Sequence, residues 1–161
     1  MKKSIWFIGL LLLVGFSGCV TSGGPKVPRI AFPLDEFAKL SRIGTASVIG
    51  QGFMKTQSGD VKFAAGNNVA LVPVTSYSNQ WYEVFIVQHR HLEPADSRYI
   101  NYYWQQIADG EGRFEFKNIP SGEYYINTYV YWYAGSYKQG GPIAKKITLK
   151  DGEIQRVILT E

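Results

Sequence analysis

The stretch that decides the fold runs from Ala108 to Val130 and reads ADGEGRFEFKNIPSGEYYINTYV. Asp109 to Gly112 supplies residues that favour a tight turn. Phe114 and Phe116 then alternate with charged residues, which is the pattern of a β-strand that buries one of its two faces. The Pro-Ser-Gly sequence at 120–122 ends that strand and permits the turn into the next one. These residues predict consecutive antiparallel strands.

The rest of the chain from residue 45 onward carries a similar pattern. Short β-prone runs are separated by glycine, proline and asparagine, which is typical of an antiparallel all-β domain. Strands are predicted near 45–54, 61–65, 69–74, 81–89, 99–107, 112–116, 122–133, 143–149 and 154–159. Before them, Leu34, Phe37 and Leu40 have helical spacing, so we expect one short helix over 34–43, packed on the sheets.

Residues 109–124 follow the order D-x-x-G-x-F-x-F-x-x-[IL]-P-x-G-x-Y, from Asp109 to Tyr124. This run resembles the carboxypeptidase regulatory-like domain, a transthyretin-like (prealbumin-like) fold. The resemblance covers about residues 44–161 and implies an antiparallel β-sandwich of about seven to nine strands. The stretch 81–106 departs from it, because it is longer and more aromatic than a minimal domain needs, and its strand order stays open. The resemblance is to the accessory module and not to the zinc-bearing catalytic domain, so it implies no catalytic residue.

The N-terminus has the pattern of a secretory signal peptide. Lys2 and Lys3 are followed by a continuous apolar or glycine run from Ile5 to Phe16. A bilayer-spanning helix needs about 20 apolar residues, and this run is shorter and leads directly into small residues and a cysteine. We therefore expect cleavage after residue 18.

The sequence Phe16-Ser17-Gly18-Cys19 resembles the lipobox of bacterial lipoproteins, although leucine is the usual residue where Phe16 stands. The resemblance implies that Cys19 is lipidated, with palmitate among its acyl chains, and becomes the mature N-terminus. Cys19 is the one cysteine of the chain, and lipidation would explain a single cysteine in an exported protein. An ordinary signal peptide with a cysteine near the cleavage site is the alternative. The resemblance to Gram-negative lipoproteins implies sorting to the outer membrane, because position 20 is Val and not the Asp that usually signals retention in the inner membrane. We expect the protein to face the periplasm; surface exposure stays open.

This interpretation divides the chain into a signal peptide (1–18), a segment with the lipidated cysteine, a flexible tether and a short helix (19–43), and the β-sandwich domain (44–161). The tether spans 20–33 and would reach at most about 50 Å. Without residues 1–18 the chain has 15 basic and 13 acidic residues, a formal charge of +2. The sequence shows no basic stripe, so nucleic acid is not an expected partner.

No catalytic motif emerges, and we expect neither an enzyme nor a cofactor. There is no H-x-x-E or G-x-S-x-G sequence. His89, His91 and Glu93 would share one face of a strand and could hold a metal, but Pro94 breaks the strand, so we interpret them as solvated and predict no metal site. The acidic residues of 109–111 are interpreted as a hairpin turn rather than a calcium loop.

The aromatic residues give the one candidate binding surface. In the strand from 124 to 133, alternation sends Tyr129, Tyr131 and Tyr133 to the face opposite the core. If the strand at 99–105 pairs with it, Tyr103 joins them, and the four tyrosines form a surface that docks a protein or stacks on a glycan. The alternative is that the helix at 34–43 or the loop at 134–142 covers this face, which makes the tyrosines a second core.

The sequence favours a non-enzymatic, lipid-anchored envelope protein that acts as a binding or assembly module. A carbohydrate- or peptidoglycan-binding lipoprotein is one alternative. A secretion-apparatus lipoprotein is another, because the small type VI secretion lipoprotein also joins a lipid anchor to a transthyretin-like sandwich. The expected partners are the membrane, an envelope protein and possible glycans; the partner's identity and the oligomeric state stay open.

Overall fold

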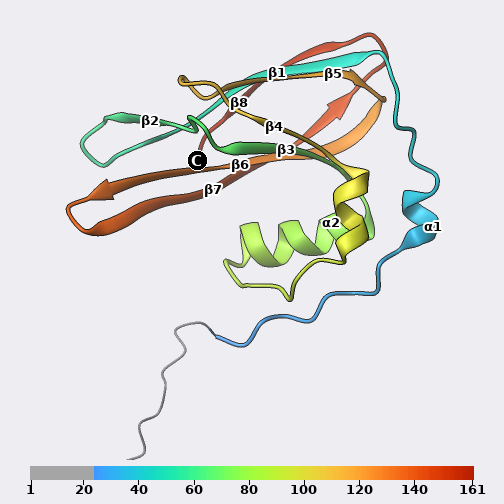
Figure 1. Ribbon diagram of the computed structural model, residues 1–161, viewed down its shortest axis with the longest axis horizontal. Coiled ribbons are helices and arrows are strands. Elements are labelled where there is room, and N and C mark those ends of the chain that lie inside the picture. Colours follow the sequence, from blue (N-terminus) through green and yellow to red (C-terminus); the bar gives the residue numbers. More distant parts are fainter. Residues whose placement is uncertain (1–23) are drawn as a thin grey trace, which may run out of the picture.

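Two β-sheets stacked face to face form the body of the protein, and a helical layer covers the outer face of one of them (Figure 1). The computed structural model describes residues 24–161. The predicted signal peptide and Cys19 lie outside the described residues. The prediction of an all-β sandwich is confirmed, and the described chain forms eight strands.

The first sheet is built around one central strand. β1 pairs antiparallel with β2 and β5, and parallel with β8. The second sheet has the order β4-β3-β6-β7 and is antiparallel throughout. The bounds are β1 Ala46–Lys55, β2 Val61–Phe63, β5 Arg113–Ile119 and β8 Ile154–Leu159 in the first sheet, and β3 Asn68–Pro73, β4 Trp104–Ile107, β6 Gly122–Ala134 and β7 Tyr137–Leu149 in the second.

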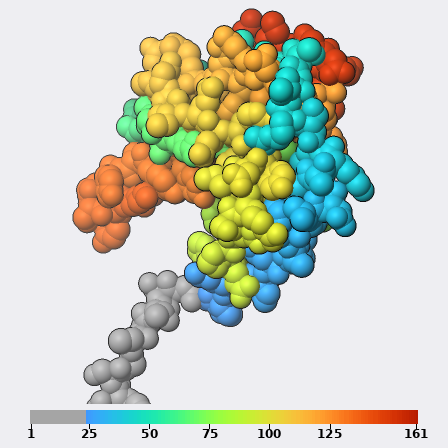
Figure 2. Space-filling model, turned by 45° about the vertical axis from the view of Figure 1, so that its right-hand side comes forward, coloured from blue at the N-terminus to red at the C-terminus, as the bar shows by residue number. Residues whose placement is uncertain are grey.

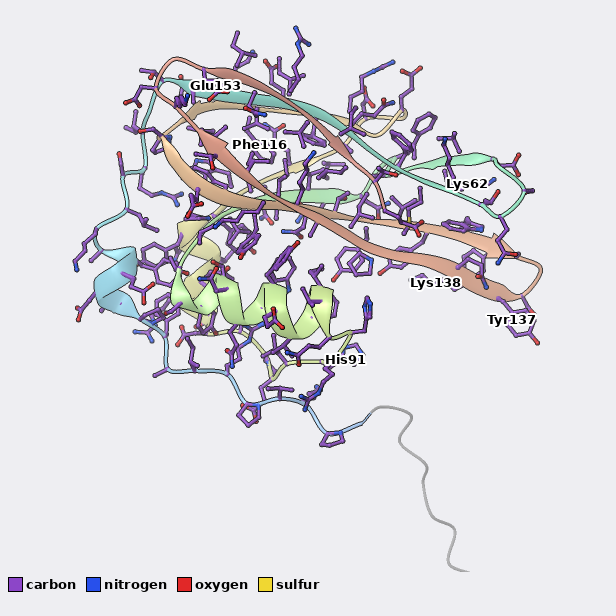
Figure 3. All side chains as sticks on the ribbon, turned by 180° about the vertical axis from the view of Figure 1, so that it is seen from behind. Lys62, His91, Phe116, Tyr137, Lys138 and Glu153 are labelled. Atoms are coloured by element: carbon purple, nitrogen blue, oxygen red, sulfur yellow. The ribbon has the colours of Figure 1, made fainter. Side chains whose placement is uncertain are left out.

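The core lies between the sheets and is filled by the alternating residues that the sequence predicts. Phe114 and Phe116 of β5 are buried, and so are Ile126 and Val130 of β6. Fully burying one such side chain stabilises the fold by about 1.5–3 kcal/mol, so this interface is the main source of stability. Figure 3 shows Phe116 between the two sheets.

The predicted hairpin turn at 109–112 is confirmed. The Asp109 carboxylate accepts hydrogen bonds from the backbone N–H groups of Glu111 and Arg113, both at 2.8 Å. Gly112 has a φ of 73°, a conformation that glycine adopts without strain. At the far end of β5, the Tyr124 hydroxyl donates to the carbonyl oxygen of Pro120 at 2.9 Å, which fastens the turn into β6.

The predicted strand at 81–89 is wrong. This segment is helical, with α2 at Ser76–Trp81 continuing into one π-helical stretch, η1, at Tyr82–Val87. A capping box starts the helix, since Thr75 Oγ1 accepts from the Ser78 N–H at 3.2 Å and Ser78 Oγ accepts from the Thr75 N–H at 2.8 Å. This local signal outweighs the β-propensity of the aromatic and β-branched residues that follow.

The predicted strand at 99–107 is half wrong. Only β4 is extended, whereas Ser97–Tyr102 forms a 3₁₀-helix, η2, whose first turn is capped by Asp96. The pairing of 99–105 with the strand at 124–133, which was the condition for a surface of four tyrosines, does not form, because β4 pairs with β3 and β3 lies between β4 and β6. The extra residues of 81–106 are therefore mainly helical, and we call α2, η1 and η2 together the helical layer.

The N-terminal segment packs on this helical layer and is not a tether from Val27 onward. The Val27 N–H donates to the His91 carbonyl at 2.7 Å, and the Glu93 N–H donates to the Val27 carbonyl at 2.9 Å. Figure 2 shows the segment (blue) against the helical layer (yellow-green). The helix predicted at 34–43 is reduced to α1, Leu34–Phe37. Within residues 24–161, no helix is long and apolar enough to span a membrane.

A second core joins these parts. Phe32 stacks on Phe37 with ring centroids 4.6 Å apart and meets Tyr77 edge-on at 5.4 Å. On the sheet side, Tyr125 of β6 stacks on Tyr82 at 4.4 Å. The outer face of β6 is thus covered in part, as the alternative predicted, but mainly by α2 and η1 rather than by residues 34–43 or 134–142.

Candidate binding site

A cavity of about 240 Å³ lies between the outer face of the second sheet and the helical layer. Alternate residues of β3 and β6 form its floor, because the residues between them point into the core. One tryptophan from α2, two tyrosines from the segment after it and one arginine from the N-terminal segment complete the wall. The lining consists of Arg29, Asn68, Ala70, Val72, Trp81, Ala95, Tyr99, Tyr103, Asn127 and Tyr129.

Aromatic rings surround this cavity on several sides. The Tyr99 ring contacts the Tyr103 ring, with centroids 5.4 Å apart. Tyr77 packs edge-on against Tyr99, with ring centroids 5.0 Å apart. Burial raises the pKa of the Tyr99 phenol well above its usual range, and burial also raises the pKa of Tyr129. Both hydroxyls therefore stay protonated at neutral pH and can donate hydrogen bonds.

Two amides on the floor provide polar groups. Asn68 donates to the Gln105 side-chain oxygen at 2.9 Å, and Asn127 makes a longer contact of 3.5 Å with the Ala70 carbonyl. A primary amide has two donor hydrogens and one acceptor oxygen, so each of these contacts occupies only part of its capacity. The cavity thus offers both donors and acceptors next to aromatic surface.

Arg29 is the charged residue of the lining. Its Nε donates to the Glu93 carbonyl oxygen at 2.8 Å, and its guanidinium carbon lies 5.0 Å from the centre of the Tyr77 ring. Its Nη1 is buried and has no hydrogen-bond partner among residues 24–161. The side chain is therefore held in place while part of its hydrogen-bonding capacity is unused.

The four tyrosines predicted as one surface are divided between two places. Tyr103 and Tyr129 line the cavity. Tyr131 and Tyr133 lie further along β6, on the long β6–β7 hairpin, and are 39% and 71% exposed. Tyr131 still stacks on Tyr129, with centroids 5.5 Å apart, so the two places adjoin.

We call residues 131–140, the outer part of the β6–β7 hairpin, the arm. It projects beyond the sandwich, with Tyr137 and Lys138 at its tip (Figures 2 and 3). Lys138 Nζ lies 3.5 Å from the centre of the Tyr131 ring, a cation–π contact. Tyr137 is 74% exposed. Within residues 24–161, the rings of Tyr133 and Tyr137 on the arm are thus largely exposed.

A second, larger cleft of about 510 Å³ separates the arm from the β1–β2 hairpin. Lys62 lines it opposite Trp132 and Tyr133. Its other lining residues are mostly polar and come from the two hairpin ends: Thr56, Gln57, Ser58, Asp60, Ala134 and Gln139. The cleft has fewer aromatic walls than the cavity, and we regard the cavity as the better candidate.

The histidine cluster does not have the geometry on which a metal site would depend. His89 and His91 follow η1 in a loop, with a φ of 53° at His89, so the strand that would align them is absent there. The His91 carbonyl instead holds the N-terminal segment. Across the described part of the chain, no group of three histidine, cysteine or acidic side chains could hold a metal ion.

Of the ten residues that line the cavity, the sequence predicts only Tyr103 and Tyr129 as site residues. The alternation of buried and outward residues along a strand predicts that Asn68 and Asn127 lie on the outer face of the sheet, because the neighbours of each in the sequence include a core residue. Trp81 and Tyr99 lie in predicted strands, whereas the structure places Trp81 in α2 and Tyr99 in η2. The residues around Arg29 in the sequence do not indicate a binding role for it, because its place beside the cavity depends on how the N-terminal segment packs on the helical layer.

Comparison with known proteins finds similar solved structures. No family model matches the chain, and no curated protein matches it. The crystal structure of "a putative carbohydrate binding protein" from Pseudomonas aeruginosa shares 29% sequence identity and a TM-score of 0.74, over 83% of this chain and 99% of that one. A chlorocatechol 1,2-dioxygenase from Pseudomonas putida overlaps with a TM-score of 0.30 and 10% identity, over 76% of this chain and 62% of that one, which is too little to support an argument.

Proposed function

We propose that the protein is a carbohydrate-binding module and that the cavity beneath the helical layer holds a sugar residue. The observation that carries the proposal is the lining itself. Rings of Trp81, Tyr99 and Tyr103 stand beside the amides of Asn68 and Asn127. A sugar ring needs this combination, because its C–H face is apolar and its hydroxyl rim both donates and accepts hydrogen bonds.

The size of the cavity restricts what enters it. A volume of about 240 Å³ is below the roughly 300–1,000 Å³ of sites that enclose drug-sized ligands. One sugar residue or the end of a longer chain therefore suits the cavity better than a whole oligosaccharide. The similarity to the P. aeruginosa protein supports the same class of ligand, since it spans nearly all of that chain.

Calorimetric titration of the purified protein with a panel of monosaccharides and disaccharides tests the proposal. The variant Asn127→Ala removes a polar group from the floor, and we expect binding about 5- to 50-fold weaker, as for the loss of one or two hydrogen bonds. Tyr137→Ala is the matched control, because Tyr137 lies on the arm and does not line the cavity. Equal affinities in all three proteins would place any sugar site elsewhere.

A lipid anchor on Cys19 remains part of the proposal. The described chain docks on the helical layer from Val27 onward, so the seven residues from Val20 to Lys26 would span at most about 25 Å from the anchor. A module held this near the outer membrane, facing the periplasm, would meet envelope glycans and proteins. Membrane fractionation of a Cys19→Ser variant tests the anchor, and a variant that stays in the membrane after a high-salt wash would refute it.

Docking of an envelope protein is a second candidate role. It is favoured by the arm, where Tyr133 and Tyr137 are both more than 70% exposed. Tyrosine is enriched in protein interfaces, because it combines a large rigid ring with a polar hydroxyl. In this proposal neither the cavity nor the arm performs catalysis.

A further inference from the structure

The cavity contains a positive charge that no acidic side chain of the described chain balances. Asp and Glu are absent from its lining, and no carboxylate of residues 24–161 lies within ion-pair distance of Arg29. Its one hydrogen bond in this part of the chain goes to a backbone carbonyl, that of Glu93. By contrast, Arg98 and Arg113 are each paired with a neighbouring acid.

A guanidinium with a buried nitrogen that lacks a hydrogen-bond partner in the described chain is unfavourable. Burying a donor without an acceptor has a free-energy cost, and the cost is larger when the group is charged. Tyr77 compensates for part of it through its ring face. A ligand that brings a negative charge to Arg29 would compensate for more, so the arrangement favours anionic ligands over neutral ones.

We infer that the sugar bound in this cavity carries a carboxylate, as a uronic acid does, and that Arg29 binds this group. The inference rests on the proposed function and specifies its ligand class. The Arg29 guanidinium is a fixed cation on the cavity wall, and a charge-assisted hydrogen bond from such a group to a carboxylate is stronger than a bond between neutral groups. A carboxylate also fits better than a phosphate monoester, because the lining provides one cation and a phosphate monoester carries nearly two negative charges.

The position of Arg29 in the chain adds a structural consequence. The segment that carries it is fastened to the helical layer on both sides of the arginine: Gln80 Nε2 donates to the Pro28 carbonyl at 2.9 Å, and the Ile30 N–H donates to Gln80 Oε1 at 3.1 Å. The guanidinium is thus held before a ligand arrives. Preorganisation of this kind lowers the entropy that binding would otherwise cost.

The test compares four probes by calorimetry: methyl glucuronoside, its methyl ester, methyl glucoside and glucose 6-phosphate. The ester keeps the size of the acid and removes its charge. We expect the acid to bind about 10- to 100-fold more tightly than the ester, and its advantage to shrink as salt is added.

Three variants test whether Arg29 causes the tighter binding of the acid. Arg29→Gln should reduce the ratio of the affinities for acid and ester to less than about threefold and leave binding of the ester unchanged. Arg29→Lys should restore part of this ratio, since lysine keeps the positive charge but not the planar guanidinium. Arg42→Gln is the matched control, because Arg42 contacts Trp104 and does not line the cavity. Thermal melting of each variant confirms that it is folded.

The outcomes separate the two proposals. If acid and ester bind equally well to the native protein, the carboxylate inference is overturned and the sugar proposal stands. Tighter binding of glucose 6-phosphate than of the glucuronoside also overturns it, in favour of a phosphate group. If none of the four probes binds and the wider saccharide panel also fails, the proposed function itself is refuted.

Discussion

At the scale of single residues, the turn at 109–112 depends on one glycine. A Cβ on Gly112 would lie 2.5 Å from the backbone oxygen of Gly52 and 3.0 Å from the Ala64 nitrogen. Both contacts are with backbone, so no flexible side chain can move aside. Together with the positive φ, they make this position accessible to glycine alone.

Gly112→Ala should therefore lower the free energy of unfolding by more than about 1 kcal/mol, because the change adds both a clash and an unfavourable backbone conformation. Gly110→Ala, two residues away, is the control: a Cβ there meets nothing within 4 Å, and the change should stay within about 0.5 kcal/mol. Urea unfolding of both variants measures the difference. Equal destabilisation by the two substitutions would contradict this account of the turn.

At the scale of elements, the arm is the part of the sheet that extends past its partners. β6 pairs with β3 only through residues 124–127, whereas its pairing with β7 continues to Ala134. The arm is thus a two-stranded ribbon with no third strand in the described chain. Two-stranded ribbons gain little stability from packing, and exposed tyrosines there contribute little to the core.

Replacing Tyr131 and Tyr133 with serine should consequently leave the melting temperature within a few degrees of the native protein. If the arm docks an envelope protein, the same double variant should lose photo-crosslinks formed in cells from a reactive residue at position 137. The single variant Ile107→Ser, at the exposed end of β4, serves as the surface control. A large loss of stability in the double variant would instead show that the arm is structural, and unchanged crosslinks would exclude these tyrosines as the docking surface.

The sequence could predict the elements whose pattern is local. The alternation of Phe114 and Phe116, and of Ile126 and Val130, depends only on strand geometry, and these residues are buried as expected. The sequence does not predict α2, because the signal for this helix is a short capping box followed by aromatic residues that also suit a strand. Arg29 and Trp81 could not be recognised as neighbours, because contacts between distant segments leave no trace in the periodicity of either one.

At the scale of the whole molecule, the helical layer and the N-terminal segment turn an ordinary sheet face into a site. Without them, Asn127 and Tyr129 would stand on an open surface, as the sequence led us to expect. With them, the same residues form the floor of a cavity walled by Trp81, Tyr99 and Arg29. The segment that closes it is also the one that would connect to a lipid anchor, so the predicted anchor and the proposed site are close in the chain.

Indole N–H signals in NMR spectra test the central claim most directly, because the tryptophans of the described chain report on different regions. Trp81 lines the cavity, Trp132 lines the cleft beside the arm, and Trp104 packs against the core between the sheets. Titration with the saccharide that binds most tightly in calorimetry should shift the Trp81 signal and leave that of Trp132 unchanged. A shift confined to Trp132 would contradict the account, since it would place the sugar in the cleft between the hairpins.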